Sequence, residues 1–170
     1  MKLMLVFFLT FCSFPAFAQP PATRDTLLDH FAGNWILTGT MDGKETTHDV
    51  SVEWVLAHQY LQMHETSREK DSSGNAAYEA IVYFGWVQES HQYGCLWLDI
   101  TGVWSFTGQG IGRGIPNGNE IPFVFKANDT SSFRNTFVYD GTTDTWKWLM
   151  DDDENGTLKP FARVTLRRKG

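Results

Sequence analysis

Apolar and polar residues alternate along most of the chain from residue 34 onward. In segment 47–56 the even positions from Val50 to Trp54 are apolar and the odd positions are polar, which is typical of a strand with one buried and one wet face. Similar runs are separated by turn signals such as Asp42-Gly43 and Asn155-Gly156. They predict about ten strands, at residues 34–41, 47–56, 60–68, 76–87, 91–99, 103–113, 120–127, 132–139, 145–152 and 158–168.

The short turns between these strands predict how they are connected. Strands joined without intervening helices form an antiparallel meander, and a meander of this length would expose two long edges unless it closed on itself. The one helical segment, residues 23–32, places Leu27, Leu28 and Phe31 on one face and ends at Gly33. We therefore expect an all-β fold, a single antiparallel up-and-down barrel with a short N-terminal helix that could plug one mouth.

The first residues have the features of a secretory signal. Lys2 precedes an apolar run over residues 3–11, and a small-x-small pattern follows at Ala16-Phe17-Ala18. We expect residues 1–18 to be a signal peptide and residues 19–170 to form the barrel domain of an exported protein, either periplasmic or secreted. No later apolar window is long enough to predict a transmembrane helix.

Composition narrows the function classes. The 170 residues include 20 acidic residues against 14 lysines and arginines, for a net charge of −6, which argues against a protein that binds nucleic acid through a basic face. Loss of Cys12 with the leader leaves Cys95 alone, so no internal disulfide can form. We expect Cys95 to be a buried apolar residue and not a nucleophile.

Inward-facing polar residues mark the first candidate site. Glu65 shares its strand face with Leu61 and Met63, and an acid in such a setting needs a partner or a raised pKa. The candidate partners are Asn135, Arg113 and Arg134. Glu65 could equally anchor a ligand or form an ion pair that closes one end of the barrel. Asp99 poses the same choice, although its place at a strand end favours a turn-capping role.

Seven tryptophans in a small domain suggest an aromatic interior. A barrel wider than eight strands tends to leave a cavity, and aromatic walls with a few polar groups are the usual lining of a small-molecule site. The residues we expect to bind the ligand are Trp54, Glu65, Trp97, Phe125, Asn135, Phe137 and Trp148. Glycine occupies every second position from residue 108 to residue 114, around the end of the predicted strand 103–113, at Gly108, Gly110, Gly112 and Gly114. This pattern predicts a strand that bends sharply, or a strand face without side chains that leaves room for a ligand.

Neither a metal nor a cofactor is predicted. Residues 151–156 match the opening of a calcium-binding loop, but Ala162 stands where the bidentate glutamate belongs, which favours a hairpin tip that turns at Asn155-Gly156. The histidines show no ligand spacing.

Several segments resemble known barrels. Phe31 to Trp35 resembles the Gly-x-Trp signature at the first strand of lipocalins and other calycins, in which a late arginine lies over the tryptophan. The resemblance implies that Gly33 and Trp35 close the barrel with Arg163 or Arg167. Segments 60–65, 78–85 and 97–102 resemble a lipocalin-like family of uncharacterised, mostly bacterial proteins, similar in outline to haem-binding nitrobindins. Nitrobindins use a histidine from the C-terminal part of the chain as the iron ligand, whereas the last histidine here is His91. The resemblance therefore does not imply that this chain binds haem.

Three functions follow as hypotheses. The leading one is an exported protein that holds a small apolar or amphipathic molecule inside the barrel. The second is a barrel enzyme, an isomerase or hydrolase, that uses an internal carboxylate or histidine. The third is a non-catalytic interaction module with a filled core. The sequence identifies neither the ligand nor the oligomeric state.

Overall fold

The computed structural model describes residues 26–103 and 106–170, so the expected signal peptide lies outside the described residues. The elements are α1 (Thr26–Asp29), β1 (Gly33–Met41), β2 (Lys44–Val55), β3 (Tyr60–Ser67), β4 (Glu79–Val87), β5 (Gln92–Asp99), the short 3₁₀ turn η1 (Gly108–Gly110), β6 (Ile111–Gly114), β7 (Glu120–Lys126), β8 (Ser131–Asp140), β9 (Thr145–Glu154) and β10 (Thr157–Arg168). None of the helices in these ranges is long and apolar enough to cross a bilayer.

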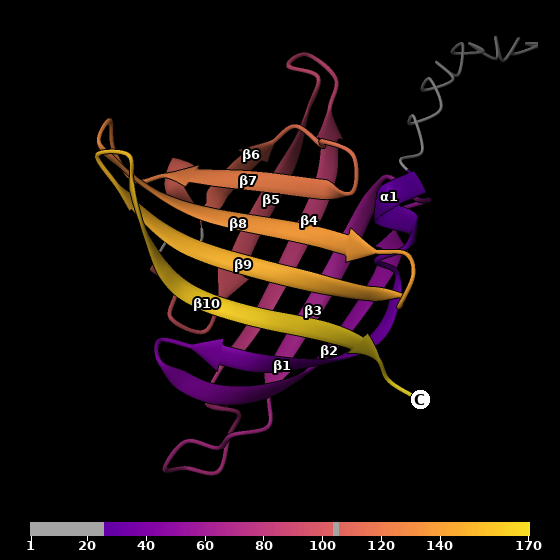
Figure 1. Cartoon of the computed structure of the whole chain (residues 1–170), viewed down its shortest axis with the longest axis vertical. Helices are drawn as coiled ribbons and strands as arrows, with labels where there is room; N and C mark the ends of the chain where they lie inside the picture. The colour runs from indigo at the N-terminus through magenta and orange to yellow at the C-terminus, as the bar shows by residue number, and fades with distance from the viewer. Residues whose placement is uncertain (1–25, 104–105) are drawn as a thin grey trace, which may run out of the picture.

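The ten strands form one closed antiparallel barrel, as predicted (Figure 1). Each strand pairs with its sequence neighbours, and β1 also pairs with β10 from Trp35↔Arg168 to Met41↔Ala162. Asn155 and Gly156, with φ of 53° and 78°, form the two-residue turn between β9 and β10 that the sequence indicated. Closure gives every strand an inner and an outer face. Pairing is least extensive at β6, which pairs with β5 over Tyr93–Leu96 and with β7 at Arg113↔Val124.

The predicted strand 103–113 is wrong for most of its length. The structure has only β6 at Ile111–Gly114, preceded by η1. β5 ends at Asp99, as predicted, where the Asp99 carboxylate accepts hydrogen bonds from the backbone N–H and the hydroxyl of Thr101. Gly102 then adopts a φ of +65°, which turns the chain out of the sheet. The turn-capping role expected of Asp99 is thus present.

Within the described residues, the helix predicted at 23–32 is confined to α1, Thr26–Asp29. The segment that contains α1 lies at one end of the barrel (Figure 1). Phe31 is 1% exposed and its ring lies 4.9 Å from Trp146, 5.3 Å from Phe137 and 5.9 Å from Phe84. These rings contact one another in tilted and edge-on geometry, the arrangement that aromatic pairs favour. This end of the interior is therefore filled by side chains.

Trp35 anchors the same end, and its arginine partner is Arg168. The Arg168 guanidinium carbon lies 3.9 Å from the centre of the Trp35 ring, and its N–H groups donate to the backbone carbonyls of Ala32 and His30. Arg163 and Arg167 were the expected partners, and neither takes this place. Arg168 has the same inward parity as Val164 and Leu166, whereas Arg163 and Arg167 have the opposite parity.

The Cys95 thiol is fully buried, as expected. Burial raises the pKa of this thiol well above its ordinary value, because the thiolate would lose its hydration. Cys95 is therefore a packed apolar side chain of β5 and has no nucleophilic character.

Arg168→Ala should destabilise the fold by about 1–2 kcal/mol, because it removes the cation–π contact and the hydrogen bonds that hold the segment before β1. Arg167→Ala is the matched control and should change the free energy of unfolding by less than about 0.5 kcal/mol. Urea unfolding followed by tryptophan fluorescence measures both. Equal losses in the two variants would contradict the assignment of Arg168 as the barrel-closing arginine.

Candidate functional site

The end of the barrel opposite α1, here called the far end, differs from the helix end. Its inward-facing side chains mix aromatic and polar groups, and many of them are only partly buried. The partly buried members are Tyr78, Trp97, Asp99, Phe133 and Phe161. Solvent therefore reaches these side chains. At the helix end Trp35 and Trp146 are 0% exposed, whereas Trp54, Trp86 and Tyr139 are partly buried there.

Five of the residues predicted to bind a ligand lie together toward the far end. The Trp97 ring lies 5.5 Å from Trp148 and 6.4 Å from Phe125, and Trp148 stacks on Phe137 at 4.8 Å. The Trp148 indole N–H donates a 2.9 Å hydrogen bond to Asn135 Oδ1. Trp148, Phe137 and Asn135 are 0–3% exposed, whereas Trp97, whose ring contacts Trp148, is half-buried.

Trp54 lies apart from this group. It is near the end of β2, at the helix end, where its indole N–H donates a 3.0 Å hydrogen bond to Asp29 Oδ1 and its ring stacks on His58. A strand as long as β2 runs from one end of the barrel to the other, so inward parity alone does not say which end a residue serves.

Glu65 is 0% exposed, and its partner is His48. The distance from His48 Nδ1 to Glu65 Oε1 is 2.5 Å. The partners suggested by the sequence are not used. Arg134 points outward and pairs with Asp153, Arg113 is exposed, and Asn135 accepts a hydrogen bond from the Trp148 indole. Glu65 Oε2 is buried and has no hydrogen-bond partner among the described residues.

His48 extends the contact toward the end of the barrel. Its Nε2 lies 2.7 Å from Thr46 Oγ1, and the Thr46 hydroxyl donates a 3.3 Å hydrogen bond to Glu69 Oε2. The order of groups is thus hydroxyl, imidazole and buried carboxylate, an arrangement that can move a proton and activate a hydroxyl. Sequence reasoning missed His48, although it shares the inward parity of Val50 on β2, and this parity was the signal that could have identified it.

Tyr78 links the acidic and aromatic parts of the far end. Its ring lies 6.0 Å from His48, its hydroxyl accepts a hydrogen bond from the Trp97 indole at 3.1 Å, and it donates to Asp99 Oδ2 at 3.4 Å. Burial raises the pKa of the Tyr78 phenol, and the negative charges of Glu65 and Asp99 raise it further. Tyr78 therefore stays protonated and acts as a hydrogen-bond donor.

We name these seven inward-facing residues the far-end cluster: His48, Glu65, Tyr78, Trp97, Asp99, Asn135 and Trp148. They come from β2, β3, the residue before β4, β5, β8 and β9. Only the closed barrel brings these strands to face a common interior.

Two of the alternating glycines are explained by close packing. A Cβ on Gly112 would lie 2.7 Å from the Phe125 ring, and a Cβ on Gly114 would lie 2.3 Å from the Pro122 carbonyl oxygen. The face without side chains on β6 is therefore occupied by Phe125 and by the backbone of β7. Gly108 and Gly110 belong to η1 and not to a strand.

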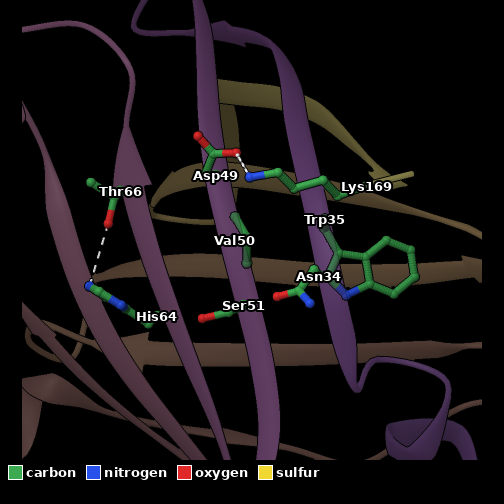
Figure 2. A pocket seen from close by; sticks show the side chains of 8 residues that line it. All are labelled: Asn34, Trp35, Asp49, Val50, Ser51, His64, Thr66 and Lys169. Carbon is green, nitrogen blue, oxygen red and sulfur yellow. Dashed lines mark hydrogen bonds and ion pairs between the residues drawn. The ribbon is translucent and has the colours of Figure 1, made fainter.

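A separate hollow of about 150 Å³ lies on the outer face of β1, β2 and β3, and Figure 2 shows its lining. Its lining is mainly polar, and its charged groups are paired. Asp49 accepts hydrogen bonds from Arg68 and Lys169, and His64 Nε2 lies 2.6 Å from Glu79. It is smaller than the usual small-molecule pocket of roughly 300–1,000 Å³. None of the predicted ligand-binding residues lines this hollow, so we place the candidate site at the far end.

His48→Phe should destabilise the fold by about 3 kcal/mol or more, because it leaves the buried Glu65 carboxylate without its partner. The double variant His48→Phe with Glu65→Met should recover much of this loss, because it also removes the buried charge. His64→Phe is the control on the outer face and should cost less than about 1 kcal/mol. Denaturant unfolding tests all three, and a double variant no more stable than His48→Phe would contradict the pairing.

Comparison with known proteins identifies the fold. No family model matches the sequence, and no curated protein matches it significantly. Among solved structures, the chain is similar to the crystal structure of Rv2717c from M. tuberculosis, with a TM-score of 0.53 and 13% identity over 84% of this chain and 95% of that one. At this identity the similarity shows a shared fold, and the chain is a β-barrel of the kind seen in Rv2717c.

Proposed function

We propose that this protein binds a small amphipathic molecule at the far end of its barrel. The observation that carries the proposal is the unpartnered and fully buried Glu65 Oε2, whose carboxylate contacts His48, and the partly exposed Tyr78 ring lies 6.0 Å from His48. A buried acceptor without a donor costs free energy, and a ligand that supplies the donor recovers it. Such groups are rare in folded proteins and call for an explanation of this kind.

The apolar part of the ligand would contact Trp97, Phe133 and Phe161. These inward-facing rings keep part of their surface in water, and covering apolar surface contributes about 25 cal/mol per Å². Exposed apolar residues in the segment after β5, at the same end, add to this surface: Ile100, Val103 and Phe106 are 57–91% exposed. Apolar surface around an opening is a common feature of binding sites.

The closed barrel weakens the interaction-module alternative, because each of its ten strands pairs with a neighbour on both sides, which leaves little edge for a partner strand. Export is part of the proposal and rests on the leader-like residues 1–18.

Binding can be tested with Nile red, an uncharged apolar dye. We expect saturable enhancement of its fluorescence by the purified protein at one site per chain. Trp97→Leu should weaken binding about tenfold, because it removes ring area from the far end. Trp54→Leu, at the helix end, is the matched control and should leave the affinity unchanged. Absence of dye binding, or equal effects of the two variants, would contradict the proposed site.

The contacts among Thr46, His48 and Glu65 favour a second candidate function, hydrolysis of an ester by the Thr46 hydroxyl. The hydroxyl would turn its proton from Glu69 Oε2 to His48 Nε2, and His48 would take this proton as general base. p-Nitrophenyl octanoate is a suitable substrate. Thr46→Val should then reduce turnover at least about a hundredfold, whereas Thr66→Val, beside the outer-face His64, should not change it. Turnover by wild type that does not exceed that of Thr46→Val would exclude this function.

A further inference from the structure

We infer that the ligand's polar end is a protonated amine, recognised by the Glu65 carboxylate. This inference rests on the proposed function and specifies its ligand class. It follows from three features of the far end: the free acceptor on Glu65, the distribution of positive charge in the barrel, and the aromatic groups beside the acceptor.

The first feature is the state of the Glu65 carboxylate. Oε1 is used by His48 Nδ1, whereas Oε2 has neither a donor nor contact with solvent. Oε2 can accept a hydrogen bond and cannot donate one while the group is ionised. An ammonium group carries three N–H donors and a positive charge, so it satisfies Oε2 with a charge-assisted hydrogen bond.

The second feature is the absence of fixed positive charge inside. Every lysine and arginine within residues 26–103 and 106–170 is exposed. The far-end cluster instead holds two carboxylates, Glu65 and Asp99, with His48 as its one basic side chain. A ligand carboxylate would meet the like charges of Glu65 and Asp99, and Lys159, which lies opposite Asp152 at the rim of this end, is already paired with Glu154, which disfavours fatty acids.

The third feature is the group of rings beside the acceptor. The Tyr78 ring stacks on His48, and its hydroxyl joins Trp97 to Asp99. The faces of tyrosine and tryptophan attract organic cations. Because Glu65 is fully buried, the ligand must displace a side chain to reach Oε2, and we assign this movement to the partly exposed Tyr78, whose ring stacks on His48.

Three ligands with the same eight-carbon chain separate the head groups: octylamine, octanoate and 1-octanol, titrated calorimetrically into the purified protein at pH 7. At this pH the amine is protonated and the acid is ionised. We expect octylamine to bind at least about tenfold more tightly than octanoate, at one site per chain. Octylamine should also displace Nile red.

Glu65→Gln tests the acceptor with almost no change in shape. Its amide oxygen can keep the bond to His48, while its NH₂ group replaces Oε2 with a donor. Octylamine affinity should fall about tenfold or more, and octanol affinity should change little. Asp99→Asn should reduce octylamine affinity by a smaller factor. Glu53→Gln on the outer face of β2 is the charge-matched control and should have no effect. Circular dichroism checks that each variant is folded.

The outcomes separate the two proposals. If Nile red binds but octanoate binds as tightly as octylamine, or octylamine does not bind, the amine inference is overturned and the proposed function stands. If Glu53→Gln weakens octylamine binding as much as Glu65→Gln does, the amine is attracted only to the acidic surface, which also overturns the inference. If Nile red and all three octyl ligands fail to bind, the proposed function itself is wrong.

Discussion

The pairing of β1 with β10 is the constraint on which the rest of this structure depends. Without it the ten strands would form an open sheet with one solvated face, and neither Glu65 nor Trp148 could be buried. Closure turns one of the two faces of each strand into an interior. The Trp35–Arg168 contact lies at the first pair of this closing ladder and ties it to the segment before β1.

The interior divides into two parts with different physical character. Around Phe31 it is a dry set of interlocking rings, and the helical segment fills the opening at that end. At the far end, carboxylate, imidazole and phenol groups lie among the rings, and solvent reaches several of them. Mixed surroundings of this kind suit recognition, because apolar area supplies affinity and a few fixed polar atoms set orientation.

Polar groups at the far end are almost fully satisfied by one another, and this makes the exception informative. Trp97, Tyr78 and Asp99 form one hydrogen-bonded series, and Thr46, His48 and Glu65 form another. In a low-dielectric interior such networks hold their members in fixed positions. Among the described residues, Glu65 Oε2 is the buried side-chain polar atom without a hydrogen-bond partner, so it is the atom that a ligand donor would satisfy.

The sequence by itself determined the strands, their antiparallel order, the closure of the barrel and most of the inward-facing residues, because period-two alternation and turn residues are local signals. It overextended the strand before Ile111, since the capping of the Thr101 N–H by the Asp99 carboxylate is a side-chain contact that alternation does not report. Only the tertiary structure decided that His48, from another strand, pairs with Glu65, and that Trp54 and Trp97 serve opposite ends. Partner choice depends on strand register and on position along the barrel axis, and both are fixed only when the sheet closes.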